Sequence, residues 1–585
     1  MRPDKRLILV ALLLAVVLPA MSLDFGLVMD DHYLVSRLER PQEALLSDPD
    51  LYTFANGDPV EMGRAIAEGP LPWWTDPKLQ LRFFRPLSSA LLRLDHALFG
   101  GFVVGWHAHA ILWNVLLVAA VGWTLRRVLP ARVAAIAILL FAVEESRLLP
   151  VVWLANRHAL VSSAIGACAV ALHLAGRGGA GSGTRVLSVV ALALAFAGGE
   201  MGLQAVAMLV AWEWLGADDA RRTRAWALAP AIVVTAIWAS IYAYGGYGAR
   251  ASDLYIDPLR QPVAFAAAVP ERLLVLIASA VVGISADPAA FSAATGVVLA
   301  GIGLLGALGA GILLRRTSGG LLWVVVGSIA ALVPATATAP SDRQVGLAAM
   351  GGVAVVASLL HAALEARGSE SGALEGPSSQ NRHTRRALRF LAPPIVLLHI
   401  LLPIAAWIAL PRFVFLPMAE AVAVAAASGD LADCGGRRLV LLSAGFGASV
   451  MGFDTRAASG EPMPAAWWTI SRAHHDLRVT RPSADVLEVA VLGGELFELP
   501  MDYLERSASS PLPIGSLYQL DGLEVKVLAA GPGGSPTRLS LRFDGSPDGD
   551  RYRIVAWRDG ELRKVTLPAV GAAVVVPWER DPMDM

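Results

Sequence analysis

Residues 102–127 read FVVGWHAHAILWNVLLVAAVGWTLRR. About 20 consecutive apolar residues suffice for a helix to cross a bilayer, and arginine pairs collect at the cytoplasmic ends of such helices. The stretch therefore predicts a transmembrane helix whose end, at Arg126 and Arg127, lies in the cytoplasm. The composition agrees, because the 585-residue chain is 55% hydrophobic and only 17% charged, with a mean hydropathy of +0.55. An ordinary cytosolic enzyme does not have this composition.

Similar apolar runs bounded by arginines occur on both sides of this stretch and predict about eleven transmembrane helices within residues 1–411. The first run, Leu7–Leu23, is a membrane helix or a cleaved signal peptide, and in both cases residues 24–101 form a large extracytoplasmic loop. The other expected spans are Val133–Val143, Val151–Leu174, two within Val186–Leu215, Ala225–Tyr244, Pro288–Leu314, Leu321–Val333, Val345–Leu364 and Phe390–Leu410.

Three segments need a separate interpretation. Val186–Leu215 would form a helix of roughly 45 Å, too long for a bilayer core of about 30 Å, so we expect a hairpin at Gly198-Gly199-Glu200. Val263–Ile284 is interpreted as a re-entrant or surface helix, because a full span would place Arg315 and Arg316 outside. Residues 365–389 are polar and predict a cytoplasmic linker.

From about residue 412 the composition changes to short β-rich runs separated by Asp-Gly pairs at 521–522, 544–545, 548–549 and 559–560. Asp-Gly between alternating apolar residues is a hairpin signal. Residues 412–585 therefore predict an extracytoplasmic all-β domain, an antiparallel sandwich or barrel. Trp467-Trp468 is expected to be an exposed pair, and Leu71-Pro72-Trp73-Trp74 of the first loop to lie at the membrane surface or to stack on a sugar.

Two adjacent acids, Asp30 and Asp31, begin the first loop directly outside the membrane. This position suits a base that serves a lipid-linked substrate, although acids also simply end a span on its outer side. The loop continues with RFFRPLS at 82–88 and LDHALFG at 94–100, and GWH at 105–107 opens the second span.

In this order the double acid and the three motifs resemble the GT-C membrane glycosyltransferases, especially their protein O-mannosyltransferase-like branch, over residues 6–364. The resemblance implies inverting transfer of a sugar from a polyprenyl-phosphate donor to a hydroxyl of a protein, glycan or lipid on the extracytoplasmic side. Glu144-Glu145 replaces the family's His-Pro, Asn156-Arg157-His158-Ala159 replaces its Gly-Arg-Lys-Asp, and Gly199 replaces the lysine before Glu200. These departures leave a non-catalytic carrier or scaffold for lipid-linked glycans as the alternative.

Such a transfer needs a base for the hydroxyl proton and cations for the leaving phosphate. Asp30 is the candidate base, and Asp31 the second carboxylate, which orients the acceptor or holds a cation; the two roles are interchangeable at this point. The candidate phosphate-binding residues are arginines that the positive-inside rule disfavours at outer turns, together with an arginine of the first loop: Arg85, Arg147, Arg157 and Arg343. Each could instead pair with Glu144, Glu145, Glu200 or Asp342.

The remaining candidates for the substrate pocket are His32, Tyr33, His107 and Glu200. His107 and Asn114 share one helix face, and Asn114 is expected to make packing hydrogen bonds. The sequence supports no metal site, although a divalent cation remains possible, and it carries no glycine-rich nucleotide loop. The expected partners are the lipid-linked donor, the acceptor and membrane lipids, without nucleic acid, and the expected location is a bacterial-type plasma membrane.

Overall fold

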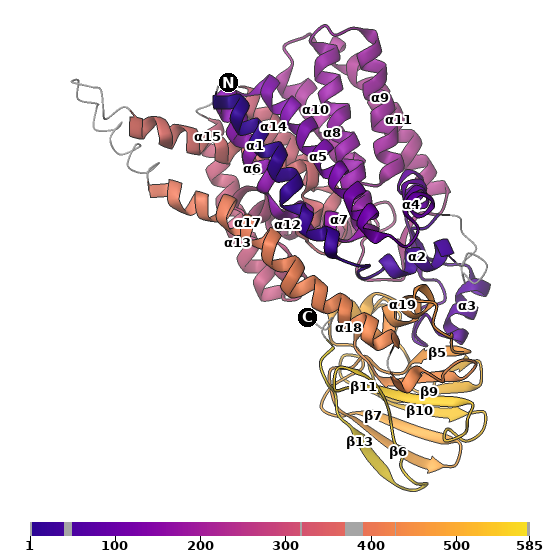
Figure 1. The fold of residues 1–585 in the computed structure, drawn as a ribbon. Coiled ribbons are helices and arrows are strands. Elements are labelled where there is room, and N and C mark those ends of the chain that lie inside the picture. The colour runs from indigo at the N-terminus through magenta and orange to yellow at the C-terminus, as the bar shows by residue number, and fades with distance from the viewer. Residues whose placement is uncertain (1–2, 40–49, 316–318, 369–389, 428, 582–585) are drawn as a thin grey trace. The chain divides into compact units, whose positions relative to one another are not determined.

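The computed structural model describes residues 3–39, 50–315, 319–368, 390–427 and 429–581 (Figure 1). Most of the predicted cytoplasmic linker lies outside these residues. The chain divides into two compact units. The helical unit comprises Met1–Phe25, Phe84–Gly246 and Asp257–Arg412, and the sheet unit comprises Gly26–Phe83, Tyr247–Ile256 and Phe413–Met585.

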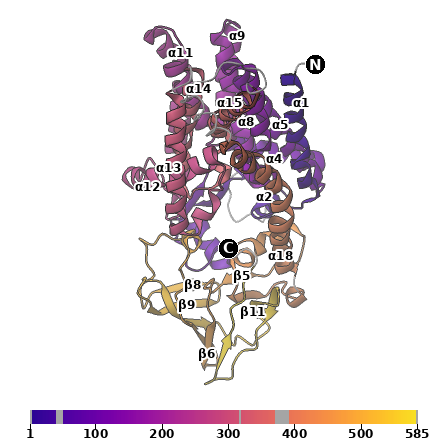
Figure 2. The same ribbon diagram turned by 90° about the vertical axis from the view of Figure 1, so that its left-hand side faces the viewer.

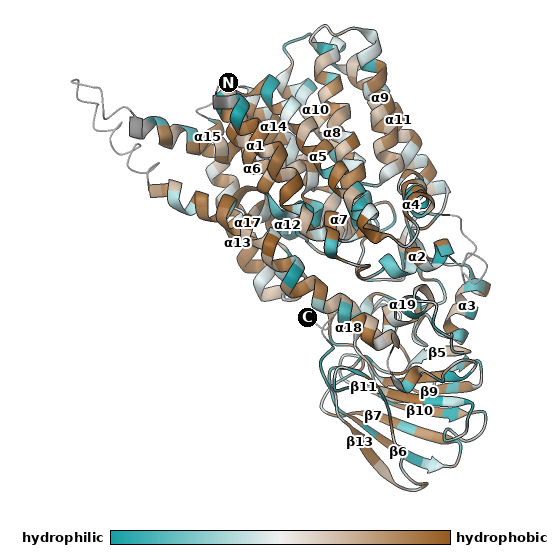
Figure 3. Cartoon of the chain, viewed as in Figure 1, coloured by the Kyte–Doolittle hydropathy of each residue, from teal (hydrophilic) through white to brown (hydrophobic). Residues whose placement is uncertain are grey.

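Among the described residues, nine helices are long and apolar enough to cross a membrane, and the chain is an integral membrane protein. Large apolar side chains such as Leu112, Ile237 and Leu305 are exposed along these helices, as lipid-facing residues are. Figure 3 shows that the helices are coloured largely as hydrophobic. The main helices are α1 (Pro3–Val17), α5 (Val103–Val128), α8 (Arg157–Arg177), α11 (Arg221–Tyr244), α12 (Pro262–Ile277), α13 (Ala293–Leu314), α14 (Gly319–Leu332), α15 (Ala349–Gly368) and α17 (Leu402–Leu410).

Shorter helices complete the unit. α8 packs against α5 and against α9 (Ser182–Gly198) (Figure 2). α10 (Gly202–Ala211) packs against α8 and α14. The others are α4 (Pro86–Phe99), α6 (Ala131–Val143), the one-turn helix α7 (Leu148–Val152) and the 3-10 turns η2 (Glu145–Arg147), η3 (Leu154–Asn156), η6 (Asp287–Ala290) and η8 (Asp342–Gln344).

The structure confirms some of the predicted helix boundaries and differs from others. The hairpin break is confirmed, because α9 ends at Gly198 and α10 begins at Gly202. The fourth apolar run is not one helix from Val151, since α7 ends at Val152 and α8 begins at Arg157. Residues 262–282 form one helical stretch that is long and apolar enough to span a membrane, so its re-entrant placement stays a prediction.

The sheet unit contains a six-stranded antiparallel sheet in the order β13-β6-β7-β10-β9-β8 and a four-stranded sheet in the order β12-β11-β4-β5. The strands of the first are β6 (Leu477–Ser483), β7 (Val486–Val491), β8 (Leu517–Leu520), β9 (Leu523–Ala530), β10 (Pro536–Phe543) and β13 (Ala573–Val576). Those of the second are β4 (Arg438–Ser443), β5 (Ala466–Thr469), β11 (Tyr552–Arg558) and β12 (Glu561–Lys564).

Two of the four predicted Asp-Gly hairpins form in this unit, whereas Asp544-Gly545 and Asp548-Gly549 lie between β10 and β11, which are strands of different sheets. Asp521-Gly522 joins β8 to β9 and Asp559-Gly560 joins β11 to β12, as predicted. The expectation of a purely antiparallel domain is wrong, because β4 pairs in parallel with both β5 and β11. Parallel neighbours need a crossover, and helix α19 (Gly452–Ala458) lies between β4 and β5. Helices α18 (Leu416–Ala427) and α19 pack against each other.

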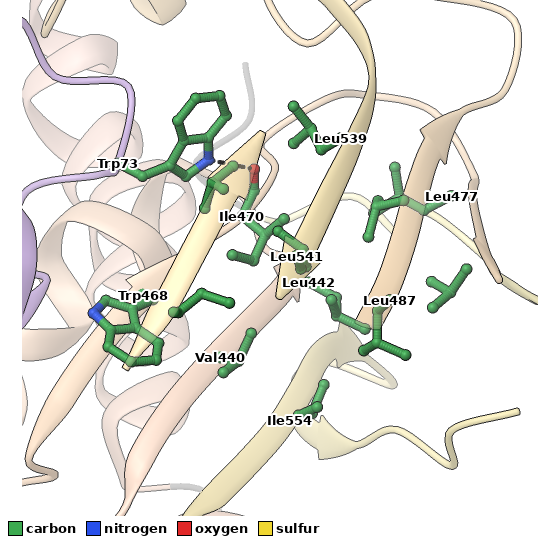
Figure 4. Packing of buried hydrophobic residues seen from close by; sticks show 14 of the residues in the cluster. Trp73, Val440, Leu442, Trp468, Ile470, Leu477, Leu487, Leu539, Leu541 and Ile554 are labelled. Atoms are coloured by element: carbon green, nitrogen blue, oxygen red, sulfur yellow. Dashed lines mark hydrogen bonds between the residues drawn. The ribbon is translucent and has the colours of Figure 1, made fainter. Parts of the chain in front are cut away.

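The core of the sheet unit lies between the two sheets, and the first loop contributes to it (Figure 4). Trp73 and Trp74 are 2% and 0% exposed, and Trp73 Nε1 donates to the Ile470 carbonyl at 3.1 Å. Trp467 and Trp468 are buried as well. The predictions of a surface-lying Trp73-Trp74 and an exposed Trp467-Trp468 are therefore wrong. Trp73, Trp74 and Trp468 lie in the core between the sheets, and Trp467 lies in a second buried cluster with Leu439 and Val555.

The first loop also supplies α2 (Asp31–Glu39), α3 (Pro59–Glu68), β1 (Thr53–Asn56) and β2 (Gln80–Arg82). Strand β3 (Gly248–Arg250) pairs with β2, so residues 248–250 complete a three-stranded sheet begun in the first loop. The pairing explains why the short segment 247–256 belongs to the sheet unit.

Candidate functional site

The two predicted carboxylates lie in a tight turn of the sheet unit and differ in their surroundings. Asp31 N donates to the Val28 carbonyl, and Asp31 Oδ2 accepts from Val28 N, both at 3.0 Å. Met29, at the next position of the turn, has a φ of +52°, which is left-handed and uncommon for a residue other than glycine. Asp31 is 1% exposed, whereas Asp30 is half-buried. Asp31 thus holds the turn, and Asp30 is the more exposed of the two carboxylates.

His32 and Tyr33 follow at the start of α2. Burial lowers the pKa of His32 to about 4, against a smaller opposing effect of a hydrogen bond to the Leu27 backbone. The Tyr33 hydroxyl donates to the Thr53 carbonyl and accepts from Arg37 Nη1 at 3.1 Å. These contacts fix Tyr33 between α2 and β1, so its hydroxyl is engaged in the structure of the loop.

In the helical unit, Arg85 and Glu200 form a pair. Arg85 Nε and Nη2 both lie 3.0 Å from Glu200 Oε2, and the Tyr242 hydroxyl donates to Glu200 Oε1 at 3.2 Å. Arg85 precedes α4, Glu200 lies in the turn before α10, and Tyr242 is near the end of α11. Three distant segments are therefore joined at one carboxylate.

Arg343 differs from the other candidate arginines. Its guanidinium lies over the Trp153 ring, 5.0 Å from the centroid, and among the described residues no carboxylate forms a salt bridge with it. The adjacent Asp342 is engaged elsewhere, since it accepts from Ser279 Oγ at 2.7 Å, Ser285 Oγ at 2.5 Å and Ala286 N at 2.8 Å. The charge of Arg343 is thus not neutralised by the acid beside it.

Arg343 and Arg85 share a neighbour, because both act electrostatically on the half-buried His158 at the start of α8. A Cβ atom at Gly199 would lie 3.1 Å from His158 Nδ1. Glycine at position 199 therefore leaves room for His158. The structure brings together Arg85, Glu200 and Arg343 from the prediction and adds His158 and Tyr242, which the sequence analysis missed.

The other two arginines are held by internal contacts. Arg157 is 2% exposed; it pairs with Asp95 and donates to the Trp106 carbonyl at 3.0 Å. Arg147 is 1% exposed; its Nε donates to Asn114 Oδ1 at 2.8 Å, and its Nη1 lies 3.6 Å from Glu144 Oε2. These contacts correspond to the pairing alternative, although the partner of Arg157 is Asp95, which was not among the expected acids.

His107 and Asn114 lie on α5 and are both 0% exposed. Asn114 Nδ2 donates to the Ala15 carbonyl at 2.9 Å while its Oδ1 accepts from Arg147. The prediction that Asn114 makes packing hydrogen bonds is confirmed. Among the described residues, no group of three or more His, Cys, Asp or Glu side chains could hold a metal ion.

Four acidic residues lie at or next to the turns η2, η6 and η8: Glu144, Glu145, Asp287 and Asp342. Burial, and then the charges of Asp342, Glu144 and Asp287, raise the pKa of Glu145 to about 8. Burial followed by Asp287 raises the pKa of Asp342 to about 6.

The raised pKa of Glu145 predicts a pH-dependent stability. Its pKa in the folded protein exceeds the ordinary value of 4.5, so its contribution is fully present below pH 4.5 and is lost as the pH rises through 8. We expect Glu145→Gln to weaken the fall of the thermal unfolding midpoint between pH 6 and pH 9. Exposed Asp218→Asn serves as the control, and an equally steep fall in Glu145→Gln would contradict the prediction.

Asp30 and Asp31 belong to the sheet unit, whereas the four arginines belong to the helical unit. The meeting of these acids and guanidinium groups in one cavity stays a prediction.

No protein-family model and no curated protein sequence matches the chain. Solved structures similar to it include the Archaeoglobus fulgidus oligosaccharyltransferase in the apo form, at 14% identity and a TM-score of 0.44, over 79% of this chain and 64% of that one. ArnT from Cupriavidus metallidurans bound to undecaprenyl phosphate is similar at 16% identity and a TM-score of 0.39, over 91% and 97% of the two chains. The chain thus spans about two thirds of the length of the archaeal enzyme.

Proposed function

We propose that the chain is a membrane glycosyltransferase of the GT-C type that moves a sugar from a polyprenyl-phosphate donor to an acceptor hydroxyl on the extracytoplasmic side. The observation that carries the proposal is the gathering of Arg85, Arg343 and His158 from three distant segments. One of these groups, Arg343, carries a positive charge without a carboxylate partner among the described residues.

The reaction breaks the bond between the anomeric carbon and a phosphate oxygen, and negative charge grows on the departing phosphate. Guanidinium groups bind phosphate through a planar set of N–H donors and stabilise such charge where water is excluded. Arg343 is assigned the direct contact with the phosphate. Arg85 is oriented for the same group by Glu200, which Tyr242 holds from the other side.

The acceptor side is assigned to the turn of Asp30. A base is needed to take the hydroxyl proton while the glycosidic bond forms. Asp30 lies in a turn that two hydrogen bonds between Asp31 and the Val28 backbone hold in place. The position of the base is therefore fixed by this turn. The acceptor is a hydroxyl of a protein, glycan or lipid at a bacterial-type plasma membrane, with the sheet unit extracytoplasmic.

The second candidate function, a non-catalytic carrier for lipid-linked glycans, would use the same phosphate-binding residues. It is favoured by the burial of Arg147 and Arg157, which removes two of the four arginines from direct contact with a ligand. A carrier binds the donor without transferring its sugar, so a transfer assay separates the two functions.

The test uses the full-length protein in vesicles with radiolabelled polyprenyl-phosphate sugars and a mixture of hydroxyl acceptors. We expect transfer by the native protein and about a tenfold or greater increase of the donor KM in Arg343→Gln, because a charge-assisted contact with phosphate contributes roughly 1.5–3 kcal/mol. Arg343→Lys should recover part of this loss, since it keeps the charge and loses the planar fork.

Exposed Arg222→Gln on α11 is the matched control and should leave the donor KM unchanged. Donor binding without transfer by the native protein would favour the carrier. An unchanged donor KM in Arg343→Gln would overturn the assignment of the phosphate site.

A further inference from the structure

The sheet unit places a second acid beside the turn of Asp30. Helix α19 packs against α2, and Asp454 of α19 lies 3.3 Å, through Oδ1, from the hydroxyl of Ser36 on α2. Asp454 also interacts electrostatically with Asp30 and Arg37. The carboxylate nearest in sequence to Asp30, that of Asp31, is instead committed to Val28 N.

Ser36 can serve both protonation states of Asp454. Its Oγ lies 2.9 Å from the Tyr33 carbonyl and 3.3 Å from Asp454 Oδ1. A hydroxyl has one proton and two lone pairs. It can therefore donate to an ionised Asp454, or donate to Tyr33 and accept from a protonated Asp454.

The groups that face Asp454 come from several elements. Ser36 and Arg37 lie on α2, and Asp30 directly precedes it. The one titratable residue of α18, Glu420, is exposed, and the turn at Gly447–Met451 has none. On α19 itself, Arg456 is buried and donates to the carbonyls of Ala426, Leu431 and Pro462.

We propose that Asp454 is a positioning residue for the transfer reaction, a carboxylate that acts through Asp30 by relaying the proton that Asp30 takes from the acceptor hydroxyl. The proposal rests on the proposed function. In the step, the acceptor O–H bond breaks and its oxygen forms the glycosidic bond. The bond from the sugar to the phosphate breaks with its electron pair remaining on the phosphate. The proton on Asp30 passes through water to Asp454, which returns it to the solvent.

The electrostatics of Asp454 suit this role. Burial raises its pKa to about 7, the hydrogen bond from Ser36 and the charge of Arg37 oppose the rise, and the charge of Asp30 adds to it. A group with a pKa near the working pH can take up and release a proton in each turnover.

The kinetic test compares native protein, Asp454→Asn and Asp454→Glu in the full-length chain. We expect kcat of the native protein to rise with pH through an inflection near 7, because Asp454 must be ionised to receive the proton. Asp454→Asn should lose this inflection and about tenfold or more in kcat with an unchanged acceptor KM, and Asp454→Glu should restore the inflection. Exposed Asp550→Asn in the same unit is the control.

A second measurement does not depend on activity. A carbodiimide labels protonated carboxyl groups, so the pH dependence of labelling at Asp454 can be followed by mass spectrometry. We expect a midpoint near pH 7 that falls in Asp30→Asn, because the charge of Asp30 raises the pKa of Asp454.

The outcomes separate this relay from the function on which it rests. If Asp454→Asn keeps the pH profile and the kcat of the native protein while Asp30→Asn is inactive, the relay alone is overturned. A labelling midpoint that Asp30→Asn does not move would also overturn it. The absence of any sugar transfer by the native protein would overturn the proposed function and the relay together.

Discussion

Asp30→Asn is expected to lower kcat for sugar transfer by about 10²–10⁴-fold, the usual contribution of a general base. The amide cannot accept the proton of the acceptor hydroxyl, whereas the shape of the side chain is preserved. The turn should stay intact, because Asp31 and the backbone of Val28 hold it without the Asp30 side chain. The measurement is the initial rate of transfer from a polyprenyl-phosphate sugar at saturating donor.

Asp31→Asn is the comparison that tests the assignment within the pair. An asparagine keeps an oxygen that can accept from Val28 N, so the turn should persist and the rate should fall much less than in Asp30→Asn. Thermal unfolding of both variants checks that the sheet unit remains folded. A greater loss in Asp31→Asn, with both proteins folded, would reverse the two roles.

The helices and hairpin turns were predictable because their signals are local. The length of a single apolar run is enough to predict a membrane helix. Asp521-Gly522 and Asp559-Gly560 each join two strands that are adjacent in sequence. The burial of Trp73 and Trp74 could not be predicted from a local signal. Whether a tryptophan lies at a membrane surface or in a core depends on its partners, and Ile470 lies about 400 positions away in the chain.

In the candidate site, too, the local features were predictable and the contacts between distant residues were not. The acids and arginines were chosen from their positions next to apolar runs, a local property. The sequence did not separate Asp30 from Asp31, because the hydrogen bond to Val28 and the left-handed Met29 that distinguish them depend on the turn's conformation. His158 and Asp454 were missed because their roles come from neighbours on other elements, Arg85 and Arg343 for the first and Ser36 for the second.

Gly69→Ala is expected to destabilise the sheet unit by about 2–5 kcal/mol, the sum of overpacking and of a left-handed backbone at a residue with a Cβ atom. Gly69 ends α3 with a φ of +100°, and a Cβ atom there would lie 2.1 Å from the Trp467 carbonyl oxygen. Because this neighbour is backbone in strand β5, it cannot move aside as a side chain could. The substitution therefore tests whether the first loop is part of the fold of the C-terminal sheets.

The matched control lies in the same helix. Gly63 is inside α3, and a Cβ atom there would meet nothing within 4 Å, so Gly63→Ala should stabilise the helix by about 0.5–1 kcal/mol. Thermal unfolding in detergent, followed by tryptophan fluorescence, reports on the sheet unit because Trp73, Trp74, Trp467 and Trp468 are all buried in it. Equal unfolding midpoints for the two variants would mean that α3 does not pack on β5. A lower midpoint for Gly69→Ala alone would mean that the loop carrying Asp30 and the strands that follow Asp454 fold together, which is the condition for the two acids to stay within reach of each other.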